Sequence, residues 1–567
     1  MVVAAFSMIA FSCNELTELD LLDNPNEVSP DQAGVDFVYN NIQLTFNNFY
    51  NNFRGISEGL VRYRTLGAFT YNNALPESSG DGAWFNAYSN LFPDIEVLES
   101  LSAERGLDIH SGSAKIMKAY VLTTLVDYFG DVPNSRAGQG TDVISPAPDP
   151  GADVYAAAEA LLDEAIAQLS GTSAGAPASD IFYNGNADNW VAAANTLKLR
   201  IYNNTRLVDA SAGAKMSSLI NSGANIIDSP DEDFQFQYGK NRNNPNSRHP
   251  FYNGDYETAD GGYMSNYFMW AMCCEKEVVD PRIRFYFFRQ VDNSLPDNDN
   301  VFSCHLTDRP EGFMPDHFAA VDANLPYCVA ADNGYYGRDH GNGSGIPPDG
   351  PIRAEFGVYP GGGRWDGDHF EFTQNAGTDG GLGEGISPIM LTSFVDFMRA
   401  EAALTAGTGE DARALLESGV RASIDKVLSF ASLDGGNVNG TRVVRGVTVS
   451  LSDLFLPDSD DIDAYVNVVL AAYDAATTDR DRLDVVVKEA FIAYHGNATE
   501  MFNMYRRTGS PLNIQPGVDA QAMPPGNEGF PRSILYPAVH VNLNAEVSQK
   551  DGLLNRVFWD DGSATLR

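Results

Sequence analysis

The chain has 567 residues and carries 37 basic against 76 acidic side chains, a formal net charge of −39. Apolar residues make up 43% of it and aromatic residues 11%, which excludes a disordered chain and predicts two intertwined lobes or a large repeat-based fold. Such a chain repels nucleic-acid phosphates and anionic membranes, and a sulfated or uronate-rich ligand would need a basic groove that few segments supply. We therefore expect any ligand to be neutral.

The first thirteen residues have the pattern of a bacterial lipoprotein signal. The apolar run Val2–Phe11 is shorter than the roughly 20 residues of a membrane-spanning helix, and small residues stand just before Cys13. We predict that residues 1–13 form a signal peptide ending at a lipidated Cys13, and that residues 14–35 form an acidic tether. The alternative is a free, buried cysteine in an N-terminal helix.

The helical period of apolar residues dominates two stretches, at about 36–227 and 389–507. Successive pairs of helices predict a solenoid-like scaffold, although no 34-residue repeat is visible. The last 60 residues, about 508–567, are interrupted by Pro and Gly and are predicted to be irregular. The predicted helices cover about 113–129, 153–169, 188–208, a segment from about 389, 411–431, 460–476 and 480–496.

Residues 228–388 lack a sustained period and are rich in Gly, Pro, Asn, Asp and aromatic residues. A loop region of this length inside a compact domain is usually functional, so we predict that it forms the ligand face. All four remaining cysteines, Cys273, Cys274, Cys304 and Cys328, lie within it. Their even number suggests one or two disulfides with undetermined pairing, and the adjacent pair excludes the CxxC spacing of a zinc site.

Motifs of catalysis do not fit their context. The GxSxG match at Gly171–Gly175 follows a predicted helix and enters a loop, whereas a nucleophile elbow needs a strand before it. We expect no enzyme activity and no cofactor. A structural calcium ion is suggested only weakly by the runs Asp297–Asn300 and Asp458–Asp461, because both lack the glycine of an EF-hand loop and the pattern favours solvated turns.

Aromatic residues beside Gly-rich turns are the predicted ligand platform. A sugar ring needs an aromatic ring against its apolar face and polar side chains around its hydroxyls. The alternative for each ring is packing beneath a loop, whereas Trp190 and Trp559 are predicted to be core. The predicted binding residues are Trp270, Tyr335, Tyr336, Arg364, Trp365 and Asp366, with Trp84 at a helix start. Substituting Trp270 or Trp365 by alanine is then expected to weaken binding without lowering the melting temperature.

Several segments in order along the chain resemble the SusD/RagB family of Bacteroidetes outer-membrane lipoproteins. They are Ser12-Cys13, Trp84-x3-Tyr88, Val126–Pro133, Tyr155–Ile166, Ala194–Arg200, Val279–Arg282, Arg399–Ala402 and Arg532–Pro537. The resemblance implies a mainly α fold with four TPR-like helix-turn-helix units, long irregular loop insertions and minor β structure, in one domain over residues 36–567. It also adds Asn72, Asn73 and Asp81 to the predicted site, because the family often uses that loop.

The resemblance further implies a lipid-anchored protein on the extracellular face of the outer membrane. It would bind an oligosaccharide or polysaccharide without cleaving it and deliver it to a SusC-like TonB-dependent transporter. A β-glucan such as laminarin is the neutral ligand we expect first. The alternatives are a peptide-binding lid on a TonB-dependent peptide transporter and a surface glycoside hydrolase.

Overall fold

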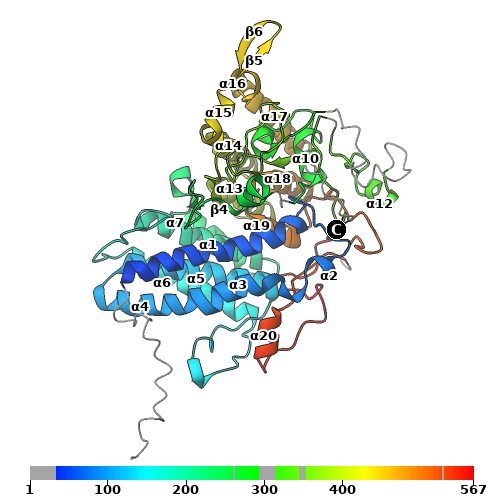
Figure 1. The fold of residues 1–567 in the computed structure, drawn as a ribbon. Helices are drawn as coiled ribbons and strands as arrows, with labels where there is room; N and C mark the ends of the chain where they lie inside the picture. The colour runs from blue at the N-terminus through cyan, green and yellow to red at the C-terminus, as the bar shows by residue number, and fades with distance from the viewer. Residues whose placement is uncertain (1–33, 259–261, 293–313, 332, 344–352, 527–528) are drawn as a thin grey trace, which may run out of the picture.

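The computed structural model describes residues 34–258, 262–292, 314–331, 333–343, 353–526 and 529–567 (Figure 1). The predicted lipidation site Cys13, most of the predicted tether and the acidic run 297–300 lie outside these residues. The described fold is mainly helical with little β structure, which confirms the predicted fold class. None of the described helices is long and apolar enough to cross a membrane.

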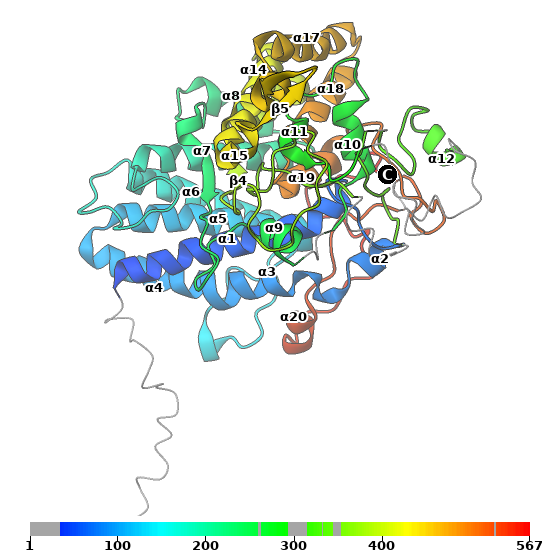
Figure 2. The same cartoon turned by 45° about the horizontal axis from the view of Figure 1, so that its top comes forward.

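Eleven of the described helices are ten residues or longer and build the scaffold. Helices neighbouring in sequence pack together, α4 with α5, α5 with α6, α6 with α7 and α13 with α14. In both views α1, α4, α5 and α6 run side by side (Figures 1 and 2). The eleven helices are α1 (Val35–Leu60), α4 (Phe92–Arg105), α5 (Asp108–Phe129), α6 (Gly151–Leu169), α7 (Ala187–Thr205), α8 (Ala212–Asn221), α13 (Thr392–Ala406), α14 (Ala412–Leu428), α17 (Ser459–Ala475), α18 (Asp479–Ala493) and α19 (Ala498–Thr508).

Shorter elements fill the segments between the long helices. The described strands form three antiparallel pairs: β1 (Phe234–Gln237) with β4 (Ile386–Met390), β2 (Phe287–Phe288) with β3 (Glu355–Phe356), and β5 (Thr441–Val444) with β6 (Val447–Ser450). The short α-helices are α2 (Tyr71–Ala74), α3 (Asp81–Phe85), α9 (Pro250–Tyr252), α10 (Asn266–Cys273), α11 (Ile283–Tyr286), α12 (Asp316–Ala319), α15 (Gly435–Val438), α16 (Leu451–Phe455) and α20 (Ala538–Leu543). Two π-helical turns, η3 (Asn86–Leu91) and η6 (Asn253–Glu257), and the 3₁₀ turns η2 (Glu77–Gly80), η4 (Gly140–Asp142), η5 (Pro230–Glu232) and η8 (Ser429–Asp434) complete the set.

A single buried carboxylate joins distant parts of the scaffold. Asp127, near the end of α5, accepts hydrogen bonds from Tyr155 of α6, from Arg200 Nη2 of α7 at 2.7 Å and from Asn503 Nδ2 of α19 at 2.8 Å. Trp559 Nε1 in the C-terminal segment donates to the same carboxylate at 2.9 Å. The predicted core position of Trp559 is therefore confirmed, and so is that of Trp190, because both side chains are fully buried.

The structure shows the surroundings of one predicted acidic run and of three of the cysteines. Asp458 caps α17, its carboxylate accepting from the backbone N–H of Asp460 and Asp461, so this acidic run has a structural role at a helix start. The weak suggestion of calcium stays a prediction. The adjacent Cys273 and Cys274 are bonded to each other at the end of α10. Cys328 is disulfide-bonded as well, and Cys304 lies outside the described residues.

A buried histidine after α18 makes stability depend on pH. His495 lies among the rings of Tyr63, Phe268 and Tyr286, and neither ring nitrogen has a hydrogen-bond partner among the described residues. Burial, aided by Arg64 and Arg54, lowers its pKa from 6.5 to about 3. The imidazole is therefore neutral in the folded chain but takes up a proton below about pH 6.5 in the unfolded chain, so its stabilising contribution is lost as the pH falls from 6.5 toward 3.

We expect His495→Phe to remove this contribution. As the pH falls from 8 to 5, the unfolding free energy of the unsubstituted chain should drop by about 2 kcal/mol more than that of the variant. The size follows because pH 5 lies about 1.5 units below the pKa of histidine in the unfolded chain. Urea unfolding of both proteins at the two pH values measures the difference. Parallel pH profiles for the two proteins would contradict the assignment.

Candidate functional site

The predicted aromatic platform in the loop region is buried. Trp365 is 0% exposed, Trp270 5%, Tyr335 6% and Tyr336 5%, so none of these rings presents a free face to solvent. Arg364 and Asp366 are buried with them. The prediction of an exposed platform at these positions is therefore wrong, and the alternative of packing beneath a loop holds for all four rings.

The Gly-rich sequence around Trp365 serves close packing of the backbone instead of exposure. A Cβ atom at Gly363 would lie 2.5 Å from the carbonyl oxygen of Gly357, a distance that real side chains do not reach. The backbone N–H of Trp365 donates to Asp434 at 2.8 Å, and the Asp366 carboxylate accepts from Arg289 Nε at 2.6 Å. Glycine here lets backbone segments approach one another closely beside Trp365, and a Cβ atom at Gly367 would lie 2.9 Å from the indole ring.

The other buried residues have equally specific partners. The Arg364 guanidinium lies 4.2 Å from the centre of the Phe288 ring. Trp270 packs beside Tyr267, and Lys488 Nζ lies 5.4 Å from the Trp270 ring centre. These contacts make the side chains structural in the described conformation.

The three polar residues added by the family resemblance lie on the surface near α2 and α3. Asn72 and Asn73 are exposed in α2, whereas Asp81 is half-buried at the start of α3. None of the three lines the hollow described next. Their role in binding stays a prediction.

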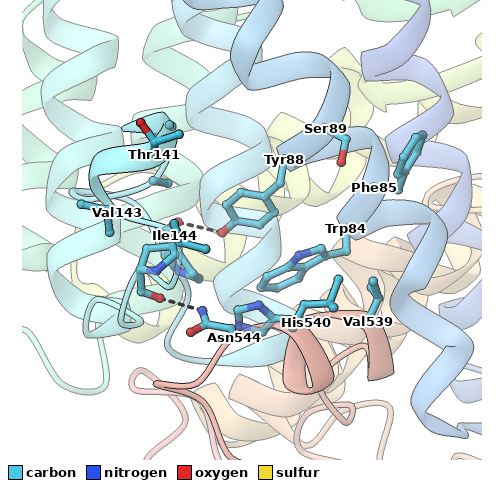
Figure 3. Close-up of a pocket in the computed structure, with 16 residues that line it drawn as sticks. Trp84, Phe85, Tyr88, Ser89, Thr141, Val143, Ile144, Val539, His540 and Asn544 are labelled. Carbon is cyan, nitrogen blue, oxygen red and sulfur yellow. Dashed lines mark hydrogen bonds between the residues drawn. The ribbon is translucent and has the colours of Figure 1, made fainter. Parts of the chain in front are cut away.

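A solvent-open hollow of about 520 Å³ lies beside Trp84, where the helical run α3–η3–α4 faces α20 and the loop of residues 133–146 (Figure 3). Trp84 is thus the predicted site residue that the structure places in this hollow. The lining consists of Trp84, Phe85, Tyr88, Ser89, Pro133, Ala137, Gly138, Gly140, Thr141, Val143, Ile144, Pro146, Val539, His540, Leu543 and Asn544.

Three rings form the floor of the hollow. Trp84 lies between Tyr88 and His540, with ring centres 4.5 Å and 4.1 Å away and interplanar angles of 35° and 36° (Figure 3). The indole is only 7% exposed, so it supports its neighbours more than it offers a face itself. Burial lowers the pKa of His540 from 6.5 to about 4, which keeps the imidazole uncharged at neutral pH.

The local chain geometry explains how these rings come together. Trp84 lies in the last turn of α3, which ends at Phe85, and Tyr88 lies in the π-helical turn η3, which inserts a wider turn before α4. Single π turns inside helices occur often at functional sites. The Tyr88 hydroxyl donates to the carbonyl of Pro133 at 2.8 Å, and Asn544 Nδ2 donates to the carbonyl of Pro146 at 2.8 Å (Figure 3). These two bonds fix the loop against the helix on one side and the C-terminal segment on the other.

The rim of the hollow is apolar and uncharged. Phe85 is 57% exposed, Ile144 81% and Leu543 75%, while Ser89 and Thr141 add exposed hydroxyl groups. The described lining contains no Asp, Glu, Lys or Arg, although the chain has a net charge of −39. An apolar, aromatic surface with a few hydroxyl and amide groups suits a neutral ligand with apolar faces.

Sequence reasoning missed most of this site. Trp84 and Tyr88 stand four residues apart, the spacing of one helix face, which is a local signal. No local signal connects them with His540, which is separated from Trp84 by more than 450 residues. The exposed Phe85 directly follows Trp84 and was not singled out.

Two family models match this chain over separate stretches. A model described as "Starch-binding associating with outer membrane" (SusD-like_2) matches residues 25–308, and one described as "Susd and RagB outer membrane lipoprotein" (SusD-like) matches residues 386–555. The chain belongs to the SusD/RagB family. A SusD/RagB protein is an outer-membrane lipoprotein by that description, which places this member at the outer membrane. No curated protein matches the chain.

Solved structures share the SusD fold over nearly the whole chain. A chitin-binding SusD homologue from Flavobacterium johnsoniae is 20% identical, with a TM-score of 0.62 and coverage of 93% of this chain and 99% of its own. A SusD/RagB family protein from Bacteroides thetaiotaomicron is 20% identical, with a TM-score of 0.64 and coverage of 94% and 100%. A SusD homologue from Bacteroides fragilis is 16% identical, with a TM-score of 0.61 and coverage of 94% and 100%.

Proposed function

We propose that this SusD/RagB protein binds a neutral oligosaccharide or polysaccharide in the Trp84 hollow and does not cleave it. The observation that carries the proposal is the uncharged, ring-floored hollow itself, opened by a π-helical turn. The family supports a binding role, and one structural neighbour is itself a chitin-binding protein. A β-glucan such as laminarin remains the ligand to try first, with chitin oligosaccharides beside it.

We expect the hollow to bind a glycan without cleaving it. Glycoside hydrolysis usually needs two carboxyl groups on either side of the scissile bond. The described lining of the hollow contains no carboxylate. A reducing-sugar assay on any glycan that binds should therefore show no product.

The proposed setting is the extracellular face of the outer membrane. We propose that a lipid on Cys13 anchors the chain there and that bound glycan passes to a SusC-like TonB-dependent transporter. The family description as an outer-membrane lipoprotein supports the anchor. The delivery step is supported only by the general association of SusD proteins with SusC-type transporters. Anchoring by one lipidated N-terminus leaves the folded chain outside the bilayer.

A peptide ligand is the second candidate. The strongly exposed Ile144 and Leu543 at the rim would suit apolar peptide side chains better than sugar hydroxyls. In that case the chain would be a lid on a TonB-dependent peptide transporter. Titration with mixed peptides separates the two functions, because a glycan site should give no heat with them.

Phe85→Ala is the variant that tests the hollow. The Phe85 ring is 57% exposed, so its loss should leave stability almost unchanged while weakening glycan affinity about tenfold through a lost stacking face. Calorimetric titration of residues 14–567 with laminarin and chitin oligosaccharides measures the affinity. Phe37→Ala is the matched control, because Phe37 is 76% exposed on α1 and does not line the hollow.

The outcomes separate clearly. Loss of affinity with Phe85→Ala alone supports the proposed site. Equal affinity in both variants would remove the hollow from the binding surface. Heat with peptides and none with any glycan would favour the peptide-lid function.

A further inference from the structure

A second hollow concentrates positive charge in this acidic protein. It has a volume of about 540 Å³ and lies where α7, α13 and α19 end and α18 begins. Four arginines, Arg206, Arg480, Arg507 and Arg567, line it, and its described lining contains no Asp or Glu. Threonine and serine hydroxyls occupy much of the remaining lining. Because only 37 basic residues occur in the chain, such clustering calls for a physical reason.

The inner wall of this hollow, formed by Arg206 and Arg507 over the buried Glu401, has two positive charges and one negative charge. Arg507 donates to the fully buried Glu401 through Nε at 2.8 Å and Nη2 at 2.6 Å, and Arg206 Nη2 lies 2.9 Å from the same carboxylate. Burial alone would raise the pKa of Glu401, but Arg507 and Arg206 lower it below its ordinary value, so the carboxylate is charged. These three groups together carry a net charge of +1, and Asp561, outside the lining, acts on Arg206 as a further negative charge.

The outer wall of the hollow is formed by Arg480 and Arg567, and both guanidinium groups donate to uncharged oxygen atoms. Arg480 Nη1 donates to Ser510 Oγ at 2.9 Å, and Arg567 Nη1 donates to the carbonyl of Leu512 at 2.8 Å. These bonds orient the guanidinium groups without neutralising them. A hollow lined by one sign of charge focuses the electrostatic field and attracts counter-ions.

Helix-end electrostatics explain two of the four arginines. Arg206 follows the C-terminus of α7 and Arg507 lies in the last turn of α19, and cations are favoured at such ends. Arg480, in contrast, lies in the first turn of α18, where the helix dipole disfavours a cation. Its position, and that of Arg567 in the irregular C-terminal segment, need another explanation.

We propose that this hollow binds the oxyanion group of a small ligand, either the carboxylate of a sugar acid or a sulfate. Guanidinium groups bind such anions through paired, charge-assisted hydrogen bonds. A volume of about 540 Å³ is sufficient for a monosaccharide together with its charged group. The site lies apart from the Trp84 hollow, with no lining residue in common, and does not depend on the function proposed there. The net charge of −39 thus disfavours anions over the surface as a whole but not in this hollow.

Titration of the chain with sodium glucuronate, sodium sulfate and glucose tests the proposal. A constant low ionic strength limits the screening of exposed arginines. Glucuronate and sulfate are expected to bind and to compete with each other, whereas glucose should give no heat. Tighter binding of glucuronate supports a sugar-acid site, and equal affinities support a simple oxyanion site. Absence of binding by both anions overturns the proposal.

Arg480→Gln provides the matched variant test. Because Arg480 is exposed, the substitution should not disturb folding, and it should weaken anion affinity about tenfold through one lost charged hydrogen bond. Arg482→Gln removes the same charge two residues further along α18, where Arg482 Nη1 pairs with Asp479 at 2.8 Å outside the hollow. Equal losses in both variants would mean general electrostatic attraction and overturn the site. Phe85→Ala should leave anion binding intact, which keeps this test separate from that of the glycan hollow.

Discussion

Replacing Trp365 by alanine is expected to destabilise the chain by about 3–5 kcal/mol, the usual cost of removing a fully buried tryptophan. The indole is 0% exposed, and a Cβ atom at Gly367 would lie 2.9 Å from its ring. The loss includes a cavity contribution, because the structure around a removed core side chain relaxes only partially. Guanidinium unfolding followed by circular dichroism measures the loss of unfolding free energy.

Trp365→Phe is the control for this prediction. The indole Nε1 has no hydrogen-bond partner among the described residues, so phenylalanine loses volume but no hydrogen bond. We expect a clearly smaller loss than with alanine. Unchanged stability of Trp365→Ala, combined with weaker glycan binding, would instead restore Trp365 as an exposed ligand platform.

The helices were predictable because their signal is local. The apolar stripe that predicts a helix over 153–169 corresponds to α6 at Gly151–Leu169, and the stripe over 188–208 corresponds to α7 at Ala187–Thr205. An α-helix buries one face of its own period, so a short window of sequence contains the information. The hairpin β5–β6 was not predicted, since its strands are only four residues long.

The candidate site was predictable only at Trp84. Whether an aromatic ring beside glycines is exposed depends on which distant segment lies over it, and Gly363 permits burial of Trp365 as readily as exposure. His540 reaches Trp84 only because the C-terminal segment returns to α3 and to the end of α5, where Tyr536 stacks on Phe129. Such meetings are properties of the complete fold, and a single sequence contains no periodic signal for them.

Asp127 is the second position with a large expected effect, because its carboxylate joins segments that lie far apart in the sequence. Asp127→Ala should destabilise the chain by about 3–5 kcal/mol, because it leaves buried donors on α6, α7, α19 and the C-terminal segment without their common acceptor. Arg200 keeps Glu500, to which its Nε donates at 2.6 Å, whereas Trp559 Nε1 loses the partner that the structure gives it. Denaturant unfolding again measures the loss.

Two comparisons separate charge from shape at this position. Asp127→Asn keeps the size and one acceptor oxygen, so it should lose less than alanine. Asp163→Ala removes a surface carboxylate that lies 2.5 Å from Lys198 and is 58% exposed, and should change stability by less than about 1 kcal/mol. A loss at Asp127 no larger than at Asp163 would mean that the packed helices, and not this shared carboxylate, join α5 to the C-terminal segment. A large loss would instead show that stability depends on this shared carboxylate, which through Trp559 holds the C-terminal segment that also carries His540 of the Trp84 hollow.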